Sequence, residues 1–165
     1  MAALILLDVI ERVLHRPEDG WLFLRELRVG TGRQASHAQR LDAFALCSWP
    51  HTGMKRVCYE VKVSRADFLC ELKHPLKRRI GMRYSNEFFF VTPPGLLRLE
   101  EIPAECGWLE VDINKPDFCT VTVPAPWRDT PGPTWQLVAA MLRNQRRELE
   151  ERPPERPRQE RIVWE

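Results

Sequence analysis

Apolar residues recur along the chain with two different spacings, one helical and one extended. Near the N-terminus the apolar positions are three or four residues apart, as on one face of an α-helix: Leu4, Leu7, Ile10 and Leu14. This spacing predicts an amphipathic helix over residues 3–15, which Pro17 ends. Similar patterns predict a helix over about 65–83, interrupted at Pro75, and a C-terminal helix over about 134–150.

Short runs of alternating or wholly apolar residues predict β-strands between these helices. The predicted strands cover residues 21–29, 40–46, 56–63, 86–91, 107–112 and 118–123. Pro50 and Gly53 lie between the second and third of these runs, which predicts that the two strands form a hairpin. Residues 86–91 are mostly apolar and predict a central strand. The order of helices and strands predicts an α/β domain.

Length and composition indicate one globular domain with a tail. With 165 residues, of which 44% are hydrophobic, the chain can bury a core of its own. We assign residues 1–150 to the domain, and we expect the Pro-, Arg- and Glu-rich residues 151–165 to form a flexible tail that contacts a protein partner. The net charge of +2 does not by itself indicate nucleic-acid binding.

The cysteines and the apolar start of the chain indicate where the protein resides. None of the five cysteines forms a C-x-x-C pair, so the sequence indicates neither a zinc site nor a disulfide framework. Residues 1–7 are apolar, but Asp8 interrupts the run before it is long enough to span a membrane. We therefore expect a cytoplasmic protein with reduced thiols and no membrane contact.

An unusual pair of charges lies on the predicted strand 56–63. Glu60 and Lys62 are two residues apart, so their side chains point to the same side of a strand. If the hairpin forms, Asp42 of the neighbouring strand can lie near Glu60. Carboxylates on strands this apolar are costly unless they are paired or bound to a metal. An ordinary ion pair on a solvated strand face is the alternative interpretation.

These residues have the chemistry of a phosphodiesterase site. Asp42, Glu60 and the backbone carbonyl of Val61 supply hard oxygen ligands, which suit Mg²⁺ or Mn²⁺. A metal-bound water oriented by Lys62 would attack a phosphodiester in line, and the lysine would stabilise the charge that builds on phosphorus.

Asp42 followed by Glu60-Val61-Lys62 resembles the D…(D/E)-x-K signature of the PD-(D/E)xK nuclease superfamily. The surrounding sequence resembles that of the MmcB-related DNA repair proteins of bacteria and phages over roughly residues 20–112. The matching stretches run in the order GTG (30–32), QRLDAFA (39–45), YEVKVSRADF (59–68), SNEFFFVTP (85–93) and IPAECG (102–107). One departure is Leu41, which precedes Asp42 where Pro is common in the superfamily.

The resemblance implies a restriction-endonuclease-like core, α-β-β-β-α-β, in which helices flank a mixed sheet. It also implies a Mg²⁺-dependent deoxyribonuclease that acts in DNA repair or phage DNA processing, in the cytoplasm of a bacterium or of a phage-infected host. Asp42 and Glu60 would be the metal ligands and Lys62 the catalytic lysine. An upstream glutamate would complete the site: Glu26 is our choice, and Glu11 is its competitor. Nucleases of this class that cut both strands often work as dimers, so a homodimer is expected.

Basic residues near the site are candidates for DNA contacts. Arg65 directly follows the charged strand, and Lys77 lies on the predicted helix beyond it. Such cations suit phosphate binding, although plain solvated charge explains them equally well. Arg40 would contact either DNA or the site carboxylates. Ser64 has the spacing of a helix cap, with Asp67 in the first helical turn.

A second class of function stays open on the sequence. The small net charge and the tail also fit a catalytically inactive module that keeps the nuclease fold and binds nucleic acid or a protein partner.

Overall fold

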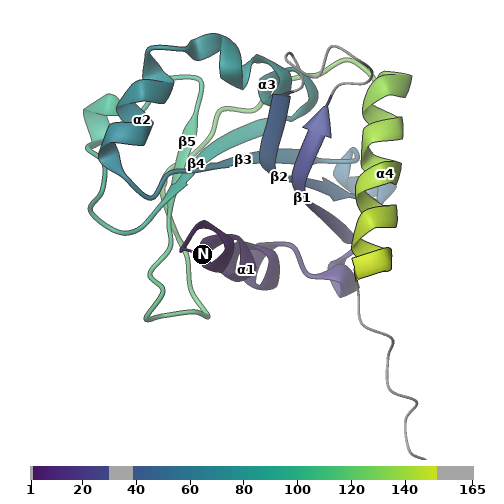
Figure 1. The fold of residues 1–165 in the computed structure, drawn as a ribbon, viewed down its shortest axis with the longest axis horizontal. Coiled ribbons are helices and arrows are strands. Elements are labelled where there is room, and N and C mark those ends of the chain that lie inside the picture. The colour runs from purple at the N-terminus through teal and green to yellow at the C-terminus, as the bar shows by residue number, and fades with distance from the viewer. Residues whose placement is uncertain (1, 30–38, 152–165) are drawn as a thin grey trace, which may run out of the picture.

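The computed structural model describes residues 2–29 and 39–151, apart from the side chain of Lys77. Within these residues it contains four α-helices and six β-strands (Figure 1). The elements in chain order are α1 (Ala2–Leu14), β1 (Trp21–Val29), β2 (Gln39–Cys47), β3 (Arg56–Val61), α2 (Arg65–Leu72), the 3₁₀ helix η4 (Pro75–Arg78), α3 (Arg79–Tyr84), β4 (Glu87–Thr92), β5 (Gly107–Glu110), β6 (Thr120–Val123) and α4 (Trp135–Glu151).

All six strands belong to one mixed sheet with the order β1-β2-β3-β4-β5-β6. The first three strands are antiparallel neighbours, β3, β4 and β5 are parallel, and β6 returns antiparallel to β5. The predicted hairpin, the interruption at Pro75 and the C-terminal helix are confirmed. The strand predicted over 56–63 is shorter than expected, because it ends at Val61.

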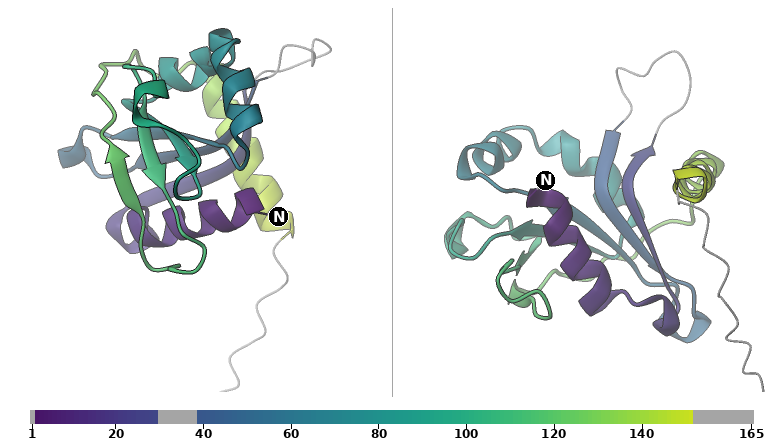
Figure 2. Two further views of the ribbon diagram at one scale, coloured as in Figure 1. Left: turned by 90° about the vertical axis from the view of Figure 1, so that its left-hand side faces the viewer. Right: turned by 60° about the horizontal axis from the view of Figure 1, so that its bottom comes forward.

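Helices cover both faces of this sheet (Figure 2). On one face α1 packs Leu6, Leu7 and Ile10 against Ala43 and Tyr59. The other face is covered by α2, α3 and α4. Their contributions to the core beneath them are Phe68, Tyr84, Leu137 and Ala140.

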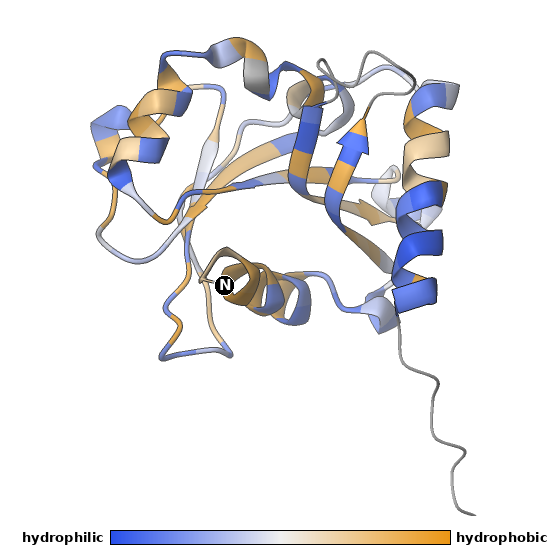
Figure 3. Ribbon diagram, in the orientation of Figure 1, coloured by the Kyte–Doolittle hydropathy of each residue, from blue (hydrophilic) through white to orange (hydrophobic). Residues whose placement is uncertain are grey.

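Strand β4 shows why a mostly apolar run predicts a central strand. Phe88 and Phe90 enter the core under α2, α3 and α4, whereas Phe89 and Val91 enter the core under α1. A strand that is buried on both faces carries apolar side chains on both, so its sequence does not alternate between apolar and polar residues. Helix α4, by contrast, is polar over its C-terminal half (Figure 3). No helix within the described residues is long and apolar enough to cross a bilayer.

Strand β1 departs from regular alternation at one residue. Leu24 and Leu27 are three positions apart, yet both pack into the core under α4. Between them Glu26 has a φ of 50°, in the left-handed region that non-glycine residues adopt rarely. The chain switches faces at Glu26, and residues beyond it follow the opposite parity.

Candidate metal and catalytic site

The predicted acidic pair lies where β2 and β3 stop pairing. Their last paired residues on this side are Ala43 and Tyr59, so Asp42 and Glu60 are the next residues along the two strands. Beyond that pair, the backbone N–H of Val61 donates a hydrogen bond of 2.9 Å to Oδ2 of Asp42. The Asp42 side chain thus takes the position of a backbone acceptor. This contact holds both carboxylates where the pairing of β2 and β3 ends, a place that we call the fork of the sheet.

The irregular residue of β1 lies beside this fork. Arg25 pairs with Ala43 and Leu27 pairs with Leu41, which places Glu26 opposite Asp42. Residues held in sparsely populated backbone regions cost of order 1–3 kcal/mol and persist where the surrounding structure fixes them, often at functional sites. The backbone irregularity of β1 therefore lies directly beside the acidic pair on β2 and β3.

Lys62 is the cation at the centre of the site. Its ammonium Nζ lies 2.8 Å from Oε1 of Glu60, 3.6 Å from Oε2 of Glu71 and 3.7 Å from Oδ2 of Asp67. The residue is 5% exposed, although its backbone follows the end of β3. Its backbone N–H continues the pairing with β4 by donating to the carbonyl of Val91 at 2.9 Å. This bond fixes the base of the lysine, and the carboxylates fix its tip.

Burial and mutual repulsion shift the protonation of the acidic pair. Burial, followed by the nearby Asp42 charge, raises the pKa of Glu60 to about 7, although Lys62 acts in the opposite direction. The pKa of Asp42 is also raised, chiefly by burial, and is partly restored by the Val61 N–H and the Lys62 charge. Burial alone would lower the pKa of Lys62, but Glu60 and Glu71 outweigh it and raise that pKa. Both acids of the pair thus hold their protons to a higher pH than ordinary carboxyl groups.

These features fit a divalent cation held by the acidic pair. The side chains of Asp42 and Glu60 are 23% and 19% exposed, so both are partly open to solvent. Among the described residues, no group of three or more His, Cys, Asp or Glu side chains is arranged to hold a metal. A cation here would therefore use two carboxylates, the Val61 carbonyl and water, a ligand set typical of Mg²⁺. It would also relieve the repulsion that raises the pKa of Glu60.

The structure separates the two candidates for the additional glutamate. Arg40 lies 3.6 Å from Oε1 of Glu26 and 3.9 Å from Oδ1 of Asp42, so it links Glu26 to the site. Glu11 instead pairs with Arg25, whose Nε donates to it at 3.2 Å on the side of the sheet covered by α1. Glu26 is thus the glutamate connected to Asp42, through a guanidinium.

The basic residues predicted to contact DNA have different surroundings. Arg65 is held by both oxygens of Glu101, and one of these bonds is 2.7 Å long. Its charge is therefore already paired. Lys77 belongs to η4, and its side chain lies outside the described part of the structure. The predicted helix cap is confirmed, because Oγ of Ser64 accepts the backbone N–H of Asp67 at 3.2 Å.

Glu71, which was not among the residues predicted from the sequence, lies in the site. Glu71 is 5% exposed and lies on α2, three residues after the fully buried Phe68. Residues at this spacing share one helix face, so the apolar Phe68 could have marked Glu71 as an inward-facing carboxylate. A buried carboxylate needs a cation, and Lys62 is the nearest one that the sequence offers on the preceding strand.

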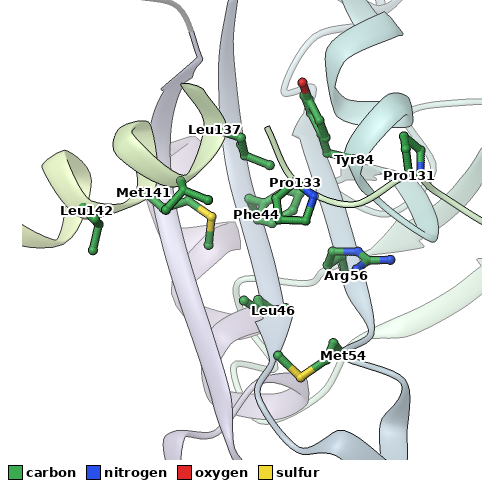
Figure 4. Close-up of a pocket in the computed structure, with 11 residues that line it drawn as sticks. Phe44, Leu46, Met54, Arg56, Tyr84, Pro131, Pro133, Leu137, Met141 and Leu142 are labelled. Atoms are coloured by element: carbon green, nitrogen blue, oxygen red, sulfur yellow. The ribbon is translucent and has the colours of Figure 1, made fainter. Parts of the chain in front are cut away.

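A separate apolar pocket lies beneath α4 (Figure 4). It has a volume of about 330 Å³, and none of Asp42, Glu60 and Lys62 lines it. Its walls come from β2, the start of β3, α4 and the preceding segment, and include Phe44, Leu46, Met54, Pro133, Leu137 and Met141. The pocket is therefore distinct from the acidic site.

Comparison with known proteins adds a likeness of fold. No family model and no curated protein matches the chain. Among solved structures, it is similar to SPO1766, a protein of unknown function from Silicibacter pomeroyi, with a TM-score of 0.62 and 22% identity. The match covers 88% of this chain and 86% of that protein. The likeness concerns the mixed α/β fold alone.

Proposed function

We propose that this protein is a Mg²⁺- or Mn²⁺-dependent deoxyribonuclease of the PD-(D/E)xK type, with a restriction-endonuclease-like core. The observation that carries the proposal is the convergence of Asp42, Glu60 and Lys62 at one fork of the sheet, where the Asp42 side chain binds the Val61 N–H. The resemblance to MmcB-related proteins favours DNA repair or phage DNA processing as its setting.

Each residue has a defined task in this proposal. Asp42 and Glu60 bind the cation. Arg40 supports Asp42 from the same strand, and Glu26 holds Arg40 from the neighbouring strand β1. Lys62 directs its ammonium to the attacking water and to the phosphate oxygens on which charge builds. A bound cation supplies a more acidic water and neutralises charge on the scissile phosphate.

The test is cleavage of duplex, single-stranded and flap DNA with Mg²⁺ or Mn²⁺. Glu60→Gln and Lys62→Met should each reduce cleavage by about 100-fold or more, because the first removes a ligand of the cation and the second removes the ammonium at the reacting phosphate. Lys55→Met is the matched control, since it breaks an ion pair of 2.8 Å with Glu87 of β4 outside the site. Full activity of the Lys62→Met protein would contradict the proposal.

One observation favours the alternative of an inactive binding module. Cations near the site have carboxylate partners within the protein: Lys62 is paired with Glu60, and Arg65 and Arg78 are paired with Glu101 and Glu105. A site of this kind can be a structural charge cluster. Calorimetric titration with Mn²⁺ separates the two functions, because an inactive module should show no Mn²⁺ binding that depends on Asp42 and Glu60.

A further inference from the structure

Two buried groups of opposite charge face each other across the junction of β3 and α2. Lys62 and Glu71 are each 5% exposed, and Lys62 Nζ lies 3.6 Å from Oε2 of Glu71. Among the described residues, Lys62 is the only cation within ion-pair distance of the Glu71 side chain. Removing one partner of such a pair leaves an uncompensated buried charge, so Lys62 and Glu71 constrain each other.

The second partner of Lys62 is the residue that the proposed function assigns to the metal. Glu60 lies 2.8 Å from Lys62 Nζ, closer than Glu71. A carboxylate oxygen that turns to a divalent cation gives up part of its bond to the ammonium. Lys62 then needs another anion to stay in place, and the buried Glu71 supplies it from a different element of the fold.

We propose that Glu71 is a positioning residue, which holds the Lys62 ammonium at the site while Glu60 binds the cation. This inference rests on the proposed function for the task of Lys62, but the anchoring itself is a property of the metal-free protein. Without Glu71, Lys62 retains Glu60 as its nearest partner, so the ammonium competes with the cation for one carboxylate.

Asp67 provides a matched control for this inference. Its Oδ2 lies 3.7 Å from Lys62 Nζ, nearly the same distance as Glu71, but its side chain is 58% exposed. An exposed pair contributes little because water screens it. Glu71→Gln and Asp67→Asn each remove one negative charge near Lys62 and preserve the shape of the side chain, so they differ mainly in burial.

The experiment measures acetylation of Lys62 by mass spectrometry, with the exposed Lys73 as internal reference. Wild type, Glu71→Gln and Asp67→Asn are compared with and without Mn²⁺. Glu71→Gln should raise the labelling rate of Lys62 by about fivefold or more, and further with Mn²⁺, whereas Asp67→Asn should stay within about twofold of wild type. Circular dichroism checks that each variant is folded. Glu71→Leu, which needs no buried partner, replaces Glu71→Gln if that protein fails to fold.

The outcomes separate this inference from the proposed function. Unchanged labelling of Lys62 in the Glu71 variant, or equal increases in the Glu71 and Asp67 variants, overturns the positioning role. If the wild type binds no Mn²⁺, the proposed function fails. The labelling of Lys62 without metal still tests whether Glu71 anchors it. If the wild type cleaves DNA, Glu71→Gln should lower kcat by about tenfold with KM for DNA little changed, and an unchanged kcat also overturns the role.

Discussion

The backbone N–H of Val61 donates to Oδ2 of Asp42 at 2.9 Å, and this bond joins β2 to β3 beyond their last paired residues. A side chain that replaces a backbone acceptor serves the fold and the site at once. It ends the regular pairing of the strands, and the second carboxylate oxygen of Asp42 lies 3.9 Å from the Arg40 guanidinium. The structural and the chemical task of Asp42 can therefore be separated by substitution.

Asp42→Ala should lower the free energy of unfolding by about 1–2 kcal/mol, because the N–H of the buried Val61 loses its acceptor. Asp42→Asn keeps a side-chain oxygen for that N–H and removes the repulsion with Glu60, so its stability should be close to that of wild type. Both variants should lose DNA cleavage. Urea unfolding and cleavage assays on the same preparations check this, and an active Asp42→Asn protein would argue against a ligand role.

Glu60→Gln should stabilise the metal-free protein at pH 8. The pKa of Glu60 is raised to about 7 by burial and by Asp42, so the unfolded chain ionises this group at a lower pH than the folded protein. The contribution of Glu60 to the free energy of unfolding therefore falls as pH rises from its ordinary pKa of 4.5 to about 7, by up to about 3 kcal/mol. Glutamine avoids that cost. Urea unfolding of both proteins with a chelator at pH 5 and pH 8 measures this difference in stability. A Glu60→Gln protein less stable than wild type at pH 8 would contradict the raised pKa of Glu60.

Affinity for Mn²⁺ should rise about tenfold per pH unit below pH 7 and level off above it, because the cation must displace a proton from Glu60. Calorimetry at pH 6 in buffers of different ionisation enthalpy should detect about one proton released per cation. Glu60→Gln is the control, with weak binding that does not follow this pH dependence. An affinity that is constant from pH 5.5 to pH 7 would show that Glu60 is already ionised or is not a ligand.

The parts of the fold that local patterns encode could be predicted from the sequence. Alternation and turn residues predicted all six strands and the hairpin that brings Asp42 towards Glu60, because these signals lie within a few positions of each other. The left-handed backbone of Glu26 could not be predicted, since nothing in the sequence around a glutamate marks such a conformation. It follows from how β1 packs on β2 and under α4.

Long-range charge pairing explains the remaining differences. Arg65 was expected to face DNA, but its partner Glu101 lies 36 positions away, where no local pattern connects the two. Glu71 was overlooked because an isolated glutamate on a helix ordinarily indicates a solvated face. Only the position of α2 over the end of β3 brings it to Lys62.

A buried histidine should make the protein sensitive to mild acid. His15 is 4% exposed, and its Nε2 lies 2.6 Å from the hydroxyl of Tyr59. The pKa of Tyr59 is raised well above its ordinary value, chiefly by burial, so the phenol stays neutral beside the imidazole. Burial, with a smaller contribution from Lys55, lowers the pKa of His15 from 6.5 to about 3. The unfolded chain therefore takes up a proton below about pH 6.5, and the folded protein does not.

Stability from His15 is accordingly present above about pH 6.5 and declines as pH falls towards 3. Between pH 7 and pH 5 the loss should be about 2 kcal/mol. His15→Gln retains a hydrogen-bonding side chain for the Tyr59 hydroxyl but cannot titrate, so its unfolding free energy should fall by about 2 kcal/mol less than that of wild type over this range. Urea unfolding of both proteins at pH 7 and pH 5 provides the comparison, in which all other titrating groups contribute equally. Equal losses in the two proteins would mean that His15 takes up its proton in the folded state near its ordinary pKa.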